Sequence, residues 1–176
     1  AEAAYVRHSN RCLRIAYADG RLLNEFKTPS KPGETNRDWG FLAYHNGILF
    51  GSTANPAHNV SPRYKLTKLR TESTALFAID AQSGKQLWQY DAKHSIRHNA
   101  LAIAGDQVYL IDRPLVTEDH IPEPKRNGRH IPKLKADQVP TGVLLALGAR
   151  TGKEVWRNEN NIIGTQLATS EQHSVL

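Results

Sequence analysis

The chain has 176 residues, of which 39% are hydrophobic and 23% are charged. This length and balance predict one folded domain with a real core and exclude an intrinsically disordered chain. The longest apolar run, residues 143–147, is far too short to cross a bilayer, so we expect no membrane span. Methionine is absent, even at position 1, and residues 1–10 lack the apolar core of a signal peptide. We therefore expect a processed product or an excised piece of a longer protein.

Cysteine content and net charge narrow the chemistry further. Cys12 is the only cysteine, which rules out an internal disulfide and any CxxC metal or redox motif. We expect it to be a half-buried strand residue rather than a reactive thiol. The formal net charge of +6 favours anionic partners, provided that the positive residues gather on one surface.

One hairpin pattern occurs three times along the chain. Each copy has two short alternating stretches around a glycine, which suits a tight turn because glycine reaches positive φ without steric cost. A side chain that can bond the local backbone, Asp19, Ser83 or Thr151, precedes each glycine. The copies occupy residues 12–26, 75–90 and 144–158, with their turns at Gly20, Gly84 and Gly152.

A second hairpin pattern alternates with the first. Residues 39–53 and 99–112 each show two strand-like runs around "HNG" or "GD". Residues 165–176 look like a truncated further copy, and residues 5–10 look like the strand before the first glycine hairpin. Repeated units of four antiparallel strands predict an all-β fold, a β-propeller with about three blades present. An ordinary β-sandwich that contains similar hairpins is the alternative.

About three blades leave an open ring, because propellers have about 4–8 blades. We therefore expect part of a larger propeller, with the remaining blades or another protein as partner. Residues 91–97 are expected to form a loop between two blades. The expected divisions are 1–26 for the end of the first blade, 39–90 for the second blade with insert 54–73, 97–158 for the third blade with insert 113–140, and 165–176 for the start of a fourth.

The glycine hairpins carry a family resemblance. Their pattern, Ala-x-Asp-x-x-Thr-Gly-x-x-x-Trp, resembles the tryptophan-docking repeat of the pyrroloquinoline-quinone-type β-propellers, the quinoprotein alcohol dehydrogenase-like family. The first copy is degenerate, with Asn24 in place of Trp. The resemblance implies that Trp88 and Trp156 pack between blades, where a large flat ring buries much apolar area. The matching positions are Ala78, Asp80, Ser83 for Thr, Gly84 and Trp88 in the second copy, and Ala146, Gly148 for Asp, Thr151, Gly152 and Trp156 in the third.

Propeller connectivity places both long inserts on one face and the tight turns on the other. Insert 54–73 has a net charge of +3 and insert 113–140 one of +2, so this loop face holds most of the net charge. We expect an anionic ligand or acidic partner there, or a solvated loop set without a ligand. Residues 63–70 alternate basic and apolar side chains, but no nucleic-acid motif accompanies them, so nucleic acid is not expected. The basic loop face comprises Arg63, Lys65, Lys68, Arg70, Lys125, Arg126 and Arg129.

The histidines and one glycine-rich turn do not match a known metal-binding or phosphate-binding motif. His94 and His98 are four residues apart, but this spacing aligns metal ligands only on a helix. His120 and His130 lie in an insert beside acidic residues, an arrangement that is most often solvated. "GARTGK" has three residues between its glycines, whereas a phosphate-binding P-loop has four. We expect no metal site and no P-loop.

Two functions from different classes fit the resemblance. The first is a binding or scaffold propeller without chemistry of its own, as in the outer-membrane assembly lipoproteins of the family. The second is part of a quinone-dependent dehydrogenase, with pyrroloquinoline quinone, a calcium ion, a catalytic Asp and often a Cys–Cys pair. With one cysteine the chain cannot contain that pair, and no catalytic residue can be carried over from the enzymes. We favour the scaffold, with no cofactor, and family habit implies a periplasmic or extracytoplasmic location.

A ligand site is expected where the inner strands begin, because those entrances face the central funnel in this family. Trp39 is the one tryptophan not assigned to docking, and its alternative role is core packing. The candidate residues for ligand binding are Arg37, Asp38, Trp39, Arg97, His98 and Asn99.

Overall fold

The regular structure consists of antiparallel β-strands, as the hairpin patterns predicted. The computed structural model describes residues 3–30, 37–56, 71–115 and 138–170. In that part of the chain there is no helix long and apolar enough to cross a membrane. The strands are β1 (Ala3–His8), β2 (Arg11–Ala16), β3 (Leu22–Lys27), β4 (Trp39–His45), β5 (Ile48–Ala54), β6 (Glu72–Asp80), β7 (Gln86–Ala104), β8 (Gln107–Arg113), β9 (Gly142–Gly148) and β10 (Glu154–Ile162).

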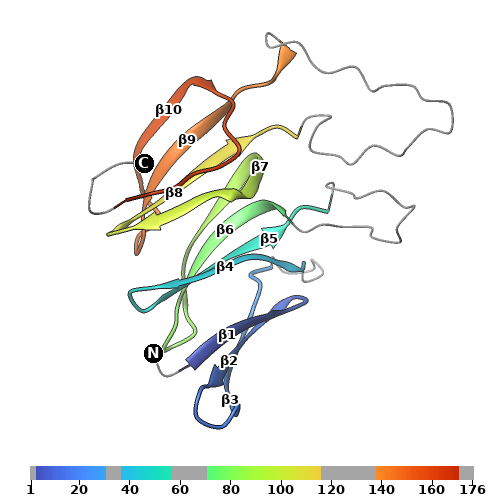
Figure 1. Cartoon of the computed structure of the whole chain (residues 1–176), viewed down its shortest axis with the longest axis vertical. Helices are drawn as coiled ribbons and strands as arrows, with labels where there is room; N and C mark the ends of the chain where they lie inside the picture. The colour runs from blue at the N-terminus through green and yellow to red at the C-terminus, as the bar shows by residue number, and fades with distance from the viewer. Residues whose placement is uncertain (1–2, 31–36, 57–70, 116–137, 171–176) are drawn as a thin grey trace, which may run out of the picture.

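The strands form two antiparallel sheets that stack along the long axis of the molecule. One sheet has the order β1-β2-β3, and the other has the order β10-β9-β8-β7-β6-β5-β4. Figure 1 shows the larger sheet bending at β7, so that β8 to β10 form an upper layer and β4 to β6 a middle layer above β1 to β3. The chain therefore has the layered, all-β architecture of a partial propeller.

The bend at β7 corrects one expectation. Residues 91–97 do not form a loop, because they belong to the continuous strand β7. Residues 86–91 pair with β6, and residues 101–104 pair with β8. Ile96 pairs on both sides, with Ser73 and with Asp112. The fully buried carboxylate of Asp112 accepts hydrogen bonds from the backbone N–H groups of Lys93 and His94, at 2.7 and 2.9 Å. The expected blade divisions stay predictions, because strand pairing does not separate the second unit from the third.

Short turns join the hairpins, and local sequence explains their geometry. β4 and β5 are joined through Asn46 and Gly47, which have φ values of 46° and 78°. A two-residue hairpin needs positive φ at both positions, which Asn-Gly adopts most easily. The two long inserts leave the larger sheet at the other ends of its strands, one between β5 and β6 and one between β8 and β9. These strand ends all lie on the right-hand side of Figure 1.

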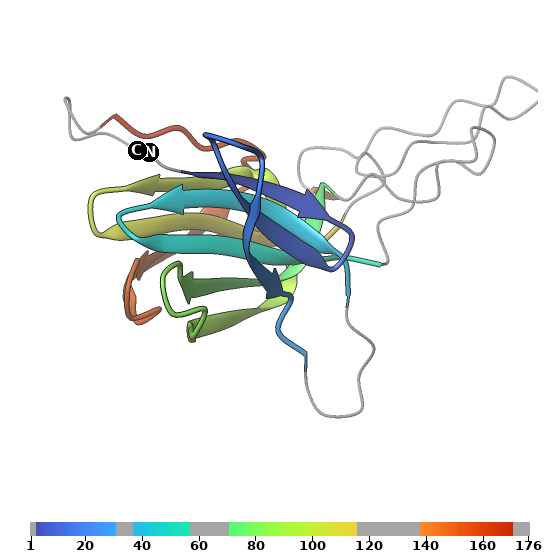
Figure 2. The same ribbon diagram turned by 90° about the horizontal axis from the view of Figure 1, so that it is seen from below.

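The core lies in two clusters on opposite faces of the middle layer. β5 is buried along its whole length, and alternate residues of β5 and β6 belong to different clusters. Phe50 and Leu76 pack towards β7, β8 and β9, whereas Leu49 and Phe77 pack towards β2 and β3. This period of two follows from the pleat of a strand. The view in Figure 2 shows the same layers from below.

One further expectation needs correction. Cys12 is fully buried in the cluster with Leu49 and Phe77, not half-buried, and burial raises its thiol pKa to about 12. Residues 163–169 contain no strand, and the expected start of a fourth blade at 165–176 stays a prediction. The backbone N–H of Leu167 instead donates a hydrogen bond to the Asn99 carbonyl, at 2.8 Å. Residues 171–176 lie outside the described part of the chain.

Candidate functional site

Three of the six candidate ligand residues meet at the first residues of β6. Arg97 bonds Glu72, His98 bonds Ser73, and Arg37 donates from Nη1 to Thr74 Oγ1 at 3.2 Å. Arg37 precedes β4, whereas Arg97 and His98 belong to the middle of β7. The strand order β7-β6-β5-β4 therefore brings together residues that are about sixty positions apart in the sequence.

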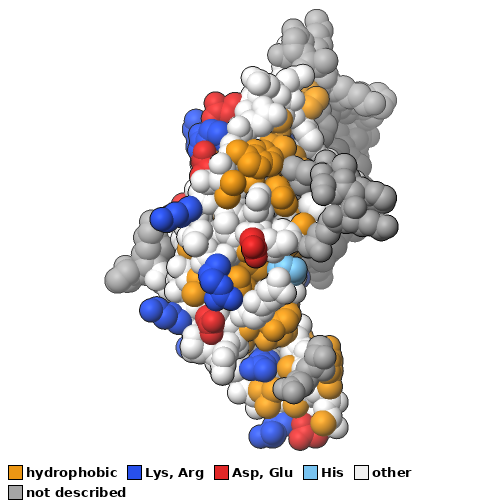
Figure 3. All heavy atoms as spheres, turned by 90° about the vertical axis from the view of Figure 1, so that its left-hand side faces the viewer, with side chains coloured by type: hydrophobic (Ala, Val, Ile, Leu, Met, Phe, Trp, Pro, Cys, Tyr) orange, Lys and Arg blue, Asp and Glu red, His pale blue; other side chains and the backbone are white. Residues whose placement is uncertain are grey.

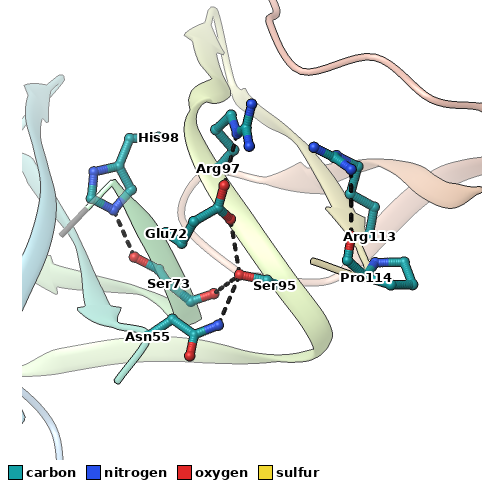
Figure 4. A network of polar contacts seen from close by, with 8 residues as sticks. All are labelled: Asn55, Glu72, Ser73, Ser95, Arg97, His98, Arg113 and Pro114. Carbon is teal, nitrogen blue, oxygen red and sulfur yellow. Dashed lines mark hydrogen bonds and ion pairs between the residues drawn. The ribbon is translucent and has the colours of Figure 1, made fainter. Parts of the chain in front are cut away.

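Glu72 is the centre of a buried polar network (Figure 4). Its side chain is 3% exposed, and its Oε1 accepts a hydrogen bond from Arg97 Nε at 2.7 Å. Its second oxygen, Oε2, accepts from Ser95 Oγ at 2.9 Å, and Asn55 Nδ2 donates to that hydroxyl oxygen at 3.0 Å. A buried carboxylate needs such partners, because an unpaired charge away from water is strongly unfavourable. The network joins β6 and β7 to Asn55, the residue that follows β5.

A second chain of hydrogen bonds lies beside the first. Ser52 Oγ is 2.7 Å from Ser73 Oγ, which is 2.8 Å from His98 Nε2. The serine–histidine distance is that of a nucleophile and its base, but both serines are fully buried and out of reach of a substrate. Gly40 completes the arrangement, since a Cβ there would lie 2.6 Å from Ser52 Oγ and 2.9 Å from the histidine nitrogen. This group therefore packs the sheet and offers no accessible nucleophile.

The other three candidates lie at separate places. Trp39 is fully buried, its Nε1 donates to the Phe41 carbonyl at 2.8 Å, and its ring meets Phe77 edge-on at 5.0 Å. Its side chain belongs to the core, so the structure supports the alternative of core packing over ligand binding. Asp38 accepts a hydrogen bond from Ser9 Oγ at 2.9 Å, and the exposed Asn99 bonds the C-terminal segment through its carbonyl.

The described carboxylates near this entrance do not fit a calcium–quinone site. Calcium needs several oxygen ligands that face the ion. Glu72 is already bonded to Arg97 and Ser95, and Asp112 accepts from two backbone N–H groups and, at 2.9 Å, from the Tyr90 hydroxyl. Within the described ranges, no group of three or more His, Cys, Asp or Glu side chains is placed to hold a metal ion. The seven residues predicted for the basic loop face lie outside the described residues, so that surface stays a prediction.

Trp88 contacts the turn that joins β9 to β10. Its side chain is 8% exposed, and its Nε1 donates to the Ala149 carbonyl at 2.8 Å. A Cβ added to Gly152 would lie 2.5 Å from Cγ of this indole, so only glycine leaves room for the ring. Ala78, directly opposite Trp88 in the β6–β7 pairing, is fully buried beneath it. Trp88 thus joins the middle layer to the turn between β9 and β10.

The other copies of the repeat differ from the second in ways that the structure explains. Asp80 Oδ1 accepts hydrogen bonds from the backbone N–H groups of Gln82 and Ser83 and from the Ser83 hydroxyl, which lowers its pKa. In the third copy Thr151 Oγ1 lies in the space that a side chain at Gly148 would occupy, so an Asp does not fit there unless the threonine moves. Local turn chemistry therefore varies while the hairpin is kept.

Phe26 is a contact residue that the sequence analysis missed. It is 3% exposed and packs in one cluster with Ala81, and a Cβ on Gly84 would lie 3.8 Å from its ring. It follows Asn24 by two positions, so both residues lie on the same face of β3. An aromatic residue two positions after the degenerate Trp position was the available signal.

Trp156 lies on β10, in the upper layer, and is more exposed than Trp88. It is 38% exposed, stands opposite Ala146 in the β9–β10 pairing, and contacts Tyr109 with ring centroids 6.0 Å apart. Beside it, Arg157 bonds Glu154 and Glu159, at 2.7 and 3.0 Å, and the arginine lowers the pKa of Glu154.

Comparison with known proteins identifies relatives of the chain. A family model described as "Outer membrane protein assembly factor BamB" matches residues 13–174. A europium-containing methanol dehydrogenase superposes with a TM-score of 0.50 at 16% identity, over 89% of this chain and 23% of that one. BamB from Moraxella catarrhalis gives a TM-score of 0.47 at 12% identity, over 90% of this chain and 35% of that one. No curated protein matches the chain. The chain thus spans less than two thirds of these structures, and the likeness to the dehydrogenase shows the fold alone.

Proposed function

We propose that this chain, which belongs to the outer membrane protein assembly factor BamB family of pyrroloquinoline-quinone-type β-propeller repeats, is a propeller segment that binds or scaffolds other molecules and catalyses no reaction. The segment is completed by further blades or by a protein partner, and its residues Trp88 and Trp156 dock one blade on the next. A periplasmic or extracytoplasmic location fits this role, as in the proteins that the family description names.

The observation that carries the proposal is the closed hydrogen-bond network at the start of β6. Arg97 and Glu72 neutralise each other, and His98 bonds the fully buried Ser73. A catalytic or cofactor-binding group must face its ligand with free donors or acceptors. These groups instead bond one another across three strands, which supports a rigid frame for the loops.

The basic loop face supplies the binding surface in this proposal, and its ligand is acidic. Replacing Arg63, Lys65 and Lys68 with glutamate reverses the charge of one insert. The matched control replaces Lys85, Arg150 and Lys153, three exposed cations near the tight turns, with glutamate. A fluorescent polyglutamate peptide is the probe, and fluorescence anisotropy at two salt concentrations measures its binding. Loss of binding in the first variant but not in the control would support the proposal. Equal loss of binding in both variants would show that the peptide responds only to the net charge of the protein.

The alternative is a segment of a quinone-dependent dehydrogenase, and one titration separates the two. The full-length parent protein is titrated with pyrroloquinoline quinone and Ca²⁺, and dye-linked oxidation of alcohols and sugars is measured. The scaffold proposal expects neither saturable quinone binding nor oxidation. Tight quinone binding together with oxidation would establish the alternative.

A further inference from the structure

The direction of one buried hydrogen-bond chain follows from its first donor. The backbone N–H of Phe41 donates to Ser52 Oγ at 2.6 Å, so this oxygen is an acceptor in that bond. Ser52 Oγ lies 2.7 Å from Ser73 Oγ. A serine hydroxyl has one proton to donate. Among the residues that the structure describes, Ser73 Oγ is the one acceptor bonded to this hydroxyl, so Ser52 donates to Ser73.

The same reasoning fixes the protonation of His98. Ser73 Oγ accepts the Ser52 proton and lies 2.8 Å from His98 Nε2, so its own proton points at that nitrogen. Figure 4 shows the imidazole facing the Ser73 hydroxyl. A ring nitrogen that accepts a hydrogen bond carries no proton, and a neutral imidazole then has its proton on the other nitrogen. Assigned from this chain, His98 is neutral with its proton on Nδ1.

Protonation of His98 would reverse the chain and leave one buried hydroxyl without an acceptor. An imidazolium donates from both nitrogens, so Ser73 would have to accept from Nε2 and turn its own proton towards Ser52. The Ser52 proton would then have no acceptor among the described residues. Both serines are fully buried, and a buried donor without a partner is strongly unfavourable.

Gly40 closes one side of this chain to water. A Cβ built on Gly40 would lie 2.6 Å from Ser52 Oγ, 2.7 Å from Ser73 Oγ and 2.9 Å from His98 Nε2. The glycine backbone therefore lies directly against all three atoms. A buried water molecule needs both space and polar partners, and the backbone of Gly40 occupies that space. A water molecule cannot supply the missing acceptor from this side.

The charged groups on the elements around His98 have partners of their own. These groups are Glu72 on β6, Arg97 on β7, Arg7 on β1, Arg37 and Asp38 before β4, and Asp112 and Arg113 on β8. Each of the three carboxylates accepts from a donor already described: Arg97, Ser9 or the backbone of β7. Arg7 Nη1 donates to the Gly40 carbonyl at 2.7 Å. The partner that these strands offer to Nε2 of the imidazole is the Ser73 hydroxyl.

We propose that the Ser52–Ser73–His98 chain is a pH-sensitive link in the sheet. The link is intact while His98 is neutral and is released when His98 takes up a proton. It joins β5, β6 and β7, one residue from each strand. The proposal concerns the frame that carries the loops, so it holds whatever ligand those loops bind.

Release of the link acts on the two ends of the insert between β5 and β6. The backbone N–H of His98 donates to the Thr71 carbonyl at 2.9 Å, where the chain returns to the sheet. The backbone N–H of Asn55, where the chain leaves the sheet, donates to the Glu72 carbonyl at 2.8 Å. Both bonds lie beside the serine–histidine chain. Acidification therefore loosens the base of this insert while the strands farther away stay paired.

Nuclear magnetic resonance of the protein with ¹⁵N-labelled histidine tests the protonation directly. The His98 signals are identified by their loss in His98→Gln, and they should show a protonated Nδ1 and an unprotonated Nε2 at about pH 8. On acidification, the His98 ring should take up its proton at least about one pH unit below the value of about 6.5 for an unperturbed histidine. A protonated Nε2 in the neutral ring would reverse the chain and overturn the proposal.

Urea denaturation tests whether the link contributes to stability. With neutral His98 the folded chain binds fewer protons than the unfolded chain, whose histidine titrates near about pH 6.5. The contribution is therefore complete above about pH 7.5 and is lost as the pH falls below about 6.5. His98→Gln keeps an acceptor oxygen but cannot be protonated, so its urea midpoint should decline less between about pH 7.5 and 5.5. Equal declines in wild type and variant would overturn the proposal.

His45 supplies the matched control. It belongs to β4, and its Nε2 lies 3.0 Å from the Gly105 carbonyl at the exposed side of the molecule where the tight turns lie. Figure 3 shows this side, with charged side chains of both signs at the surface. His45→Gln removes a histidine without touching the serine chain, so it must keep the wild-type decline. A decline lost in His45→Gln but kept in His98→Gln would contradict the assignment to His98.

Hydrogen exchange shows whether the release is local. After correction for intrinsic exchange, protection of the His98 and Asn55 amides should fall at least about tenfold between about pH 7.5 and 5.5 in wild type. In His98→Gln the protection of the Asn55 amide should stay constant, and amides of β8 and β9 should keep their protection in both proteins. Unchanged protection of His98 and Asn55 in acid would overturn the proposal even with the protonation as assigned.

Discussion

The indole of Trp88 occupies the space that the missing side chain of Gly152 leaves, 64 residues further along the chain. The ring nitrogen also donates a hydrogen bond to Ala149, so a single side chain both fills and orients this contact. Trp88 belongs to β7, and strand pairing alone joins β7 to β9 only through β8. The tryptophan therefore adds a direct contact between the middle layer and the turn above it.

Gly152→Ala should destabilise the fold far more than a change at another turn glycine. Positive φ costs an alanine about 1–2 kcal/mol at either site, and overlap with Trp88 adds about 1–3 kcal/mol at Gly152 alone. Gly105→Ala is the control, because its φ is 53° and its added Cβ meets nothing within 4 Å. Urea denaturation followed by circular dichroism measures both. Equal losses would contradict the contact.

Trp88→Ala and Trp156→Ala should differ strongly although the repeat places them at equivalent positions. Removing the buried Trp88 ring should cost about 3–5 kcal/mol of unfolding free energy, and removing the exposed Trp156 ring under about 1 kcal/mol. Urea denaturation followed by circular dichroism measures both variants. Similar costs at both sites would mean that Trp156 is covered in solution.

Glu72→Ala should be costly because it removes the buried carboxylate that accepts hydrogen bonds from both Arg97 Nε and Ser95 Oγ. The expected loss is about 2–4 kcal/mol, since breaking a largely buried, hydrogen-bonded ion pair is strongly destabilising. Glu25→Ala is the matched control: it breaks the Arg11–Glu25 pair, with a separation of 3.2 Å and side chains 41% and 30% exposed. That loss should be about 0–1 kcal/mol. A control as costly as Glu72→Ala would contradict the distinction.

Cys12 should make the fold less stable in alkali. Burial raises its thiol pKa from 9.0 to about 12, so the unfolded chain loses this proton first as the pH rises. The contribution is complete below pH 9 and declines between pH 9 and 12, with a slope of at most about 1.4 kcal/mol per pH unit. Burial also raises the pKa of Tyr90, which acts in the same direction from a higher pH. Urea denaturation of wild type and Cys12→Ala at pH 8.5 to 10 should therefore show a flatter decline in the variant, and parallel declines would exclude this role.

Much of the fold was accessible from the sequence because turn chemistry is local. The "HNG" hairpin and the glycine turns each need specific backbone angles, and the residues that adopt them stand next to each other in the chain. The alternation of β5 and β6 also predicted strands. The continuity of β7 could not be predicted, because the buried Asp112 that holds residues 93 and 94 in place comes from the neighbouring strand.

For the candidate site, too, the sequence predicted residue types but not the contacts that those residues make. Residue types near an expected funnel suggested Arg97, His98 and Trp39 as ligand residues. Whether a guanidinium or imidazole is available depends on what lies beside it, and here Glu72 and Ser73 are those neighbours. Trp39 is core because Phe77 and Phe41 enclose its ring and its N–H group. None of these partners lies within ten residues of its counterpart except Phe41.

By itself, the sequence determined the repeated hairpins, the all-β propeller class and the tryptophans at equivalent positions, because these follow from periodicity and local backbone preference. Only the tertiary structure decided that Trp88 is covered and Trp156 exposed, that Phe26 replaces the missing tryptophan of the first repeat, and that the polar residues around Glu72 bond one another. Burial and hydrogen-bond partnership depend on which distant segments pack together, so equivalent residues in a repeat can have different physical roles.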